Sequence, residues 1–184
     1  MYNIFIAAGL LPVSGILAMV LPRRLRPVVF IGAVISALGF ALRPVIPFMV
    51  TFVPPAPHQY AVRWPWPFGE IGFTLDPLAA FFVVLILVAL LLIAFGSSAW
   101  NRAAGAGSRF HYLFIGIMGS AMLLLVAVEN LLVFLFFWEI MTVAAFALIM
   151  ENSAEIEFFP FRINWFTAMH VGMLFLLIPV LIIM

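Results

Sequence analysis

Six long apolar segments, separated by short polar connections, dominate the pattern along the chain. A helix needs about 20 apolar residues to cross roughly 30 Å of hydrocarbon, and each segment has about that length. We therefore predict an all-α membrane protein in which residues 1–184 form a single membrane domain of about six transmembrane helices. The expected spans are 3–21, 28–50, 77–96, 110–129, 130–150 and 162–184, with only the tight turn Glu129-Asn130 between the fourth and the fifth.

The connection 51–76 is the one long segment outside these spans, and prolines at its start block a helix there. Near its end Ile71, Phe73 and Leu75 alternate with Gly72, Thr74 and Asp76, a period of two that indicates a β-strand. We expect this strand to form a short external β-hairpin with residues 60–64. The alternative is an ordered loop lying on the membrane surface without chemistry of its own.

Composition agrees with the membrane assignment and excludes several classes of function. The chain is 67% hydrophobic and only 8% charged, with a mean hydropathy of +1.31, far too apolar for the surface of a soluble domain. A net charge of +1 predicts no nucleic-acid partner, and the absence of cysteine excludes disulfides and thiolate metal sites. No cation precedes the first apolar segment, so we expect a retained span and not a signal peptide.

Arginine positions predict the orientation, because short cytoplasmic loops carry an excess of Lys and Arg. The first, third and fifth connections, which alternate with the two others, carry most of the arginines. We therefore expect these three connections to face the cytoplasm and both termini to lie outside, in the plasma (inner) membrane of a bacterium or archaeon. The arginines on the expected cytoplasmic side are Arg23, Arg24, Arg26, Arg102, Arg109 and Arg162, and those on the other side are Arg43 and Arg63.

One carboxylate interrupts the fifth apolar segment, and it is the first candidate for chemistry. Glu139 lies nine residues after Asn130, which at 1.5 Å per residue is about 13 Å deep and near the bilayer midplane. A charge there costs about 2.5–3.5 kcal/mol on insertion scales, so such residues face the protein interior and are neutral or paired. Glu139 is therefore either a proton-relay group or a protonated acid that links two helices by a hydrogen bond.

Three other polar residues are candidates to act with Glu139. Thr142 lies one turn further on the same helical face and can donate a hydrogen bond. His170 lies in the sixth segment, which runs antiparallel to the fifth, so both side chains reach similar depths. A histidine can pass protons near neutral pH, although a neutral hydrogen-bonded histidine is equally consistent with the pattern. Glu129, at the outer end of the fourth segment, has a surface role as its main alternative.

Small residues at helical spacing predict close helix packing on two faces. Gly32, Ser36 and Gly39 share a face of the second span, and Gly116 and Ser120 share a face of the fourth. No nucleotide-binding or zinc-protease motif is present. Two facing histidines would suit haem, but only His170 lies deep in a span, so we predict no cofactor and no metal.

Three stretches resemble a known family. Residues 127–152, AVENLLVFLFFWEIMTVAAFALIMEN, resemble the fourth-to-fifth-helix signature of the antiporter-like subunits of respiratory complex I (NADH-quinone oxidoreductase). The same signature occurs in group 4 hydrogenases, formate hydrogenlyases and Mrp-type cation/proton antiporters. Its acid-Asn pair corresponds to Glu129-Asn130, and its Trp-Glu pair, which follows an aromatic-rich run, to Trp138-Glu139.

The other two stretches resemble the segments that open the third and sixth helices of this family. They are FTLDPLAAFF at 73–82 and FRINWFTAMHVG at 161–172, whose His-x-Gly ending is typical of the hydrogenase-type members. The resemblance implies that Glu139 is the relay glutamate of a proton- or sodium-translocating subunit, with Trp138 supporting it. Members of the family have many more helices, and one of these carries a lysine that faces the glutamate.

The resemblance also implies partners. This chain has no lysine, so we expect other membrane subunits of a multi-subunit redox complex, including a chain that supplies the later helices and the lysine, besides membrane lipids. Redox chemistry would belong to those other subunits. The alternative is a structural membrane subunit, or a truncated fragment, without transport activity of its own. An independent small transporter is a weaker possibility, because the chain shows no internal inverted repeat.

Overall fold

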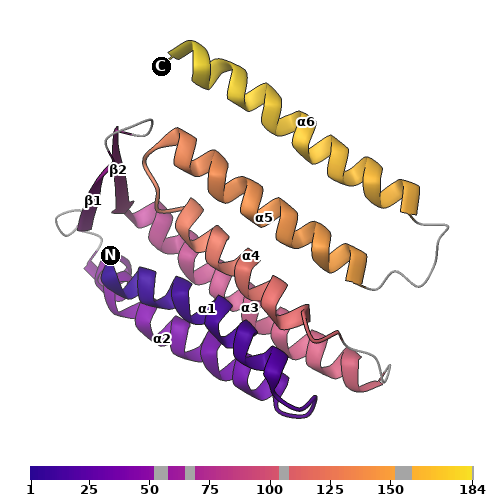
Figure 1. The fold of residues 1–184 in the computed structure, drawn as a ribbon. Coiled ribbons are helices and arrows are strands. Elements are labelled where there is room, and N and C mark those ends of the chain that lie inside the picture. The colour runs from indigo at the N-terminus through magenta and orange to yellow at the C-terminus, as the bar shows by residue number, and fades with distance from the viewer. Residues whose placement is uncertain (52–57, 65–68, 104–107, 152–158, 184) are drawn as a thin grey trace.

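The computed structural model describes residues 1–51, 58–64, 69–103, 108–151 and 159–183, which form six helices and one two-stranded sheet. The chain is an all-α membrane protein with a small sheet at one end of the helices (Figure 1). The helices are α1 (Tyr2–Val20), α2 (Arg26–Thr51), α3 (Pro77–Ala103), α4 (His111–Leu125), α5 (Leu131–Glu151) and α6 (Phe159–Ile183), and the strands are β1 (His58–Trp64) and β2 (Gly69–Leu75).

The expected hairpin is confirmed. Strands β1 and β2 pair antiparallel, with Tyr60 opposite Phe73 and Val62 opposite Ile71. In Figure 1 the hairpin, the start of α1 and the end of α6 all lie at one end of the helices, whereas α1, α3 and α5 end at the other. Both termini are therefore on the hairpin side of the protein, opposite the arginine-rich connections.

The fourth span is shorter than the sequence predicted. Within the described residues, five helices are long and apolar enough to cross a membrane, but α4 has 15 residues and ends at Leu125. The prediction of a helix to residue 129 and a tight turn at Glu129-Asn130 is wrong, because the chain leaves the helix to pair with the hairpin. Phe73 of β2 forms an isolated antiparallel bridge with Val128.

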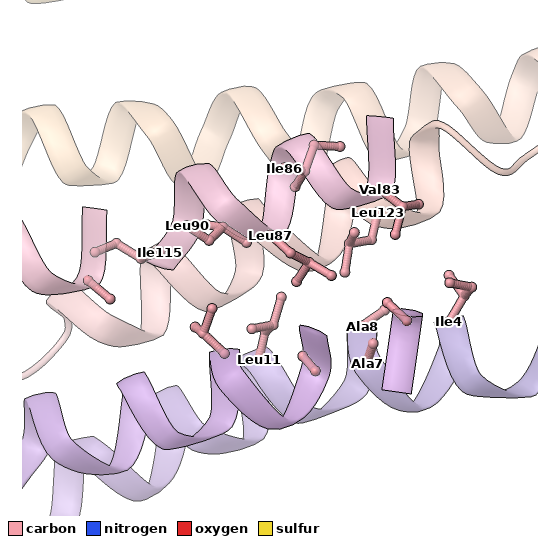
Figure 2. Packing of buried hydrophobic residues seen from close by; sticks show 14 of the residues in the cluster. Ile4, Ala7, Ala8, Leu11, Val83, Ile86, Leu87, Leu90, Ile115 and Leu123 are labelled. Atoms are coloured by element: carbon pink, nitrogen blue, oxygen red, sulfur yellow. The ribbon is translucent and has the colours of Figure 1, made fainter. Parts of the chain in front are cut away.

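The core lies between the pair α1–α2 and the pair α3–α4. Figure 2 shows Leu11 and Ala8 of α1 facing Leu87 and Leu90 of α3, with Leu123 of α4 beside them. These side chains are at most 2% exposed. Helix α5 packs on α4, and α6 lies outermost, against α5 (Figure 1). The structure thus has a buried four-helix part and an outer layer formed by α5 and α6.

Glycines allow α1 and α4 to approach closely. A Cβ on Gly116 of α4 would lie 2.5 Å from the carbonyl oxygen of Leu11, and one on Gly15 of α1 would lie 2.5 Å from the Cα of Leu113. The prediction of a packing face at Gly116 is therefore confirmed. The prediction for Gly32 and Gly39 is wrong within the described residues, because their Cβ positions have no neighbour within 4 Å.

Candidate functional site

Helix α5 carries Glu139 in its interior, and Asn130 determines where this helix begins. The side-chain Oδ1 of Asn130 accepts hydrogen bonds from the backbone N–H groups of Leu132 and Val133, at 3.0 and 3.2 Å. Asn commonly caps a helix in this way, by accepting hydrogen bonds from first-turn N–H groups that have no partner within the helix. Glu139 is therefore in the third turn of a continuous helix, about 13 Å from the cap.

Glu139 pairs with His170 of α6. The Nε2 atom of His170 lies 2.9 Å from Oε2 of Glu139, so the two residues that the sequence placed at similar depth are in direct contact. The side chains of His170 and Glu139 are 31% and 25% exposed. The exposed part of this pair lies among apolar side chains on the outer layer, where a membrane or another protein chain would cover it.

The hydrogen bonds of His170 define what this pair can do with a proton. Its Nδ1 atom lies 2.9 Å from the backbone oxygen of Phe166. A carbonyl oxygen only accepts, so Nδ1 carries a hydrogen in this bond. The 2.9 Å contact with Glu139 then needs a second hydrogen, either on Nε2 as part of an imidazolium or on the carboxyl group. The pair therefore holds one exchangeable proton, which either partner can carry.

Aromatic rings hold the imidazole in place. The His170 ring lies 3.9 Å from the ring of Phe166, which in turn lies 4.4 Å from that of Phe146 on α5 (centroid distances). A ring that is packed on one side and hydrogen-bonded at Nδ1 has little rotational freedom. The arrangement keeps Nε2 directed at the carboxylate of Glu139.

The second carboxylate oxygen of Glu139 is without a protein partner. Oε1 is buried and makes no hydrogen bond within the described residues. Glu139 also lines a groove of about 270 Å³ between α4 and α5, and the other lining residues are apolar: Phe114, Ile117, Phe136, Ile140, Val143 and Ala144. The carboxylate thus contacts a histidine through one oxygen and has an acceptor left for another donor.

Thr142 and Trp138 do not contact the Glu139 carboxylate. The hydroxyl of Thr142 is buried and donates to the backbone oxygen of Glu139 at 3.0 Å. A threonine in a helix commonly makes this bond to its own preceding turn, which leaves no donor for a side chain. The Trp138 ring packs on Phe134, and its indole N–H is buried and unpaired within the described residues. A supporting role for Trp138 stays a prediction.

Glu129 belongs to a different part of the molecule, the junction with the hairpin. Its backbone N–H donates to the oxygen of Gly72 at 2.9 Å, and Ala127 accepts from the N–H of Thr74 at 2.8 Å. The hydroxyl of Thr74 donates to the Glu129 carboxylate. Ten residues, or about 15 Å of chain rise, separate Glu129 from Glu139. The structure does not bring Glu129 together with Glu139 and His170, and its relay role stays a prediction.

A second histidine–carboxylate pair was missed by the sequence reasoning. Nδ1 of His111, the first residue of α4, lies 2.7 Å from Oε2 of Glu151, the last residue of α5. The antiparallel order of α4 and α5 was the available signal, because it places the start of one beside the end of the other. Within the described residues, no three His, Cys, Asp or Glu side chains are close enough to hold a metal ion.

Comparison with known proteins shows similarity in structure only. No family model and no curated protein sequence matches the chain. Among solved structures, it is similar to a chain of the membrane-bound sulfane sulfur reductase, an archaeal respiratory membrane complex, with a TM-score of 0.76 and 19% identity. The match covers 97% of this chain but 27% of that one, so the chain spans about a quarter of the matched protein's length. The comparison shows that this chain has the fold of a segment of a respiratory membrane complex.

Proposed function

We propose that the chain is an antiporter-like membrane subunit of a respiratory, complex I-like or hydrogenase-like complex, and that it takes part in proton or sodium translocation. The structural similarity to a chain of a respiratory membrane complex supports the subunit assignment. The observation that carries the transport assignment is the 2.9 Å contact between His170 and Glu139 in the interior of two membrane-crossing helices. This pair holds one proton that either side chain can carry.

The pair has the features that a relay group needs. One oxygen of Glu139 contacts the imidazole, and the other is buried without a partner within the described residues. A cation brought near the unpaired oxygen would favour the carboxylate and release the shared proton, and removal of that cation would favour protonation. We propose that another subunit or a later segment of a longer chain supplies this cation, as the resemblance implies for a lysine.

Replacement of Glu139 by Gln tests the proposal. Glutamine has the same shape and can still bond to His170, but it cannot lose a proton. In membrane vesicles containing the assembled complex, we expect Glu139→Gln to reduce redox-driven proton or sodium uptake by at least about tenfold. Glu70→Gln is the matched control, since Glu70 is exposed on the hairpin. Uptake equal to that of the unmodified complex, with normal assembly, would contradict the relay role of Glu139.

A structural subunit without transport activity is the second candidate. It is favoured by the position of α6, which lies outermost and packs mainly on α5, so that the Glu139–His170 contact also links these two helices. In that case Glu139→Gln, which preserves a hydrogen bond, would leave transport unchanged, whereas Glu139→Leu would weaken the attachment of α6. The two variants together separate a proton-carrying role from a purely structural one.

A further inference from the structure

The pair formed by His111 and Glu151 is the most buried acid–base contact in the described part of the chain. The side chains are 18% and 6% exposed, against 31% and 25% for His170 and Glu139. The two residues are 40 positions apart in sequence and join the start of α4 to the end of α5. The function proposed above does not use either residue.

Each partner of this pair keeps one buried polar atom without a hydrogen bond. These atoms are Nε2 of His111 and Oε1 of Glu151, and neither has a partner within the described residues. Buried polar atoms in native proteins are nearly always satisfied, so two in one contact indicate a water molecule or a proton-exchange role.

The chemistry of the contact leaves Nε2 available to a proton. When the carboxylate of Glu151 is ionised it only accepts, and Nδ1 of His111 then carries the hydrogen between them. Nε2 of the neutral ring then has a free lone pair, and binding of one proton there forms an imidazolium beside a carboxylate. Loss of that proton returns the neutral ring without breaking the bond at Nδ1. The pair can therefore gain and lose a proton without rearrangement of the helices.

Few other charges act on this pair. At the same end of the helices, the described cations are Arg23, Arg24, Arg26, Arg109 and Arg162. None of them forms a salt bridge with Glu151 within the described residues, in which His111 is its ionic partner. The guanidinium of Arg109 lies 4.9 Å above the ring of Phe110, and Arg26 donates to the backbone oxygen of Leu21. Protonation of His111 thus changes the net charge of the pair directly.

His111 and Glu151 lie on α4 and α5, the same two helices that line the groove beside Glu139. Glu139 precedes Glu151 by twelve residues, or about 18 Å of helix. The groove that Glu139 lines extends along α4 and α5 to Phe114, one turn from His111. The groove has a volume of about 270 Å³, and Glu139 is the polar residue of its lining.

We propose that His111 and Glu151 form a second proton-binding site, at the arginine-rich end of α5, which exchanges protons with water on that side and with the Glu139–His170 pair. The transfer forms and breaks only N–H and O–H bonds: Nε2 takes one proton from a hydronium ion on that side and releases it to water that passes it towards the Glu139–His170 pair. The proposal rests on the proposed translocation function, because the site has no proton to deliver unless Glu139 is a relay group.

Two conservative variants test this site in the assembled complex. His111→Asn can still donate to Glu151 from a position near Nδ1, and Glu151→Gln can still accept from His111, but neither variant retains the ion-pair chemistry. A site that collects protons matters most where protons are scarce. We expect both variants to lower redox-driven proton uptake by vesicles roughly tenfold at alkaline pH and much less at acidic pH.

The outcomes separate this inference from the proposed function. Uptake that equals the unmodified complex at every pH, while Glu139→Gln abolishes it, would overturn the second site alone. Normal uptake in Glu139→Gln would overturn the proposed function. If the variants do not assemble, the ¹⁵N resonances of the three histidines in the unmodified full chain, in lipid bilayers, provide the test. A hydrogen on Nε2 of His111 should exchange with water, and an Nε2 that does not exchange a hydrogen with water would refute the site.

Discussion

Helices α1 and α4 pack through glycines, whereas α5 and α6 meet through large polar and aromatic side chains. The first pair has glycines at the contact, and a Cβ on Gly15 or Gly116 would lie 2.5 Å from the backbone of the facing helix. The second pair meets through a histidine, a glutamate and stacked rings, and a Cβ on Gly172 of α6 would have no neighbour within 4 Å in the described residues.

The α1–α4 contact stabilises the fold, whereas the α5–α6 contact carries the candidate functional residues. Close backbone packing leaves little room for movement or for water, and the described residues of the buried core include no Asp, Glu, His, Lys or Arg. The outer layer holds Glu139 and His170, whose side chains are partly exposed. Oε1 of Glu139 has no hydrogen-bond partner within the described residues. The four-helix part thus supports α5 on one side, while its Glu139 meets α6 on the other.

The largest effect is expected from a single added methyl group at the α1–α4 contact. Gly116→Ala places a carbon against the Leu11 carbonyl, where the obstacle is backbone, and should destabilise the protein by about 2–3 kcal/mol. Gly39→Ala is the matched control, because Gly39 has open space and alanine favours helix by about 1 kcal/mol. Thermal unfolding of the full chain in lipid nanodiscs measures both. Equal stability of the two variants would show that α1 and α4 are not packed as described.

An intermediate effect is expected at the α5–α6 contact. His170→Leu leaves the carboxyl group of Glu139 without its partner and should cost roughly 0.6–1.7 kcal/mol, the range found for polar links between the helices of a membrane protein. His170→Gln keeps a donor near the position of Nε2 and should cost less. The same unfolding experiment compares them. If leucine and glutamine were equally tolerated, the hydrogen bond would not contribute to the attachment of α6.

The smallest effect is expected at the hairpin. Thr74→Val removes the hydroxyl that donates to Glu129 but leaves the backbone bonds to Gly72 and Ala127 in place, so we expect a loss of about 0.5–1 kcal/mol, confined to this junction. Hydrogen exchange of the Thr74 and Glu129 amides should become faster, while the amides of α1 and α4 stay protected. Faster exchange throughout the protein would mean that the hairpin supports the whole fold.

Much of the fold follows from local sequence patterns. Apolar runs predicted all six helices and a period of two predicted the hairpin, because both reflect how each short segment meets lipid or water. The depth of Glu139 and His170 was also predictable, since rise per residue converts sequence position into depth. The end of α4 was not, because Ala127 and Val128 continue the apolar run of the helix but, with Glu129, pair with β2 instead.

Other features depended on which helices are neighbours. Gly32 and Gly116 belong to equally plausible packing motifs, yet only Gly116 faces a nearby backbone in the described structure. Thr142 shares a helical face with Glu139, but its hydroxyl bonds to the helix backbone, where an acceptor is always within reach. Two acids and two histidines became pairs only because α5 contacts α4 along one side and α6 along another.

The sequence by itself determined that the chain is a helical membrane protein, where its apolar helices lie, and that a carboxylate and a histidine lie in the interior of two of them. These properties depend on the transfer of each segment into hydrocarbon, which needs no knowledge of its neighbours. Only the tertiary structure decided that His170 contacts Glu139, that Glu129 belongs to the hairpin junction, and that His111 meets Glu151. Hydrogen bonds act over about 3 Å, so they depend on the rotation and register of packed helices, which hydropathy does not encode.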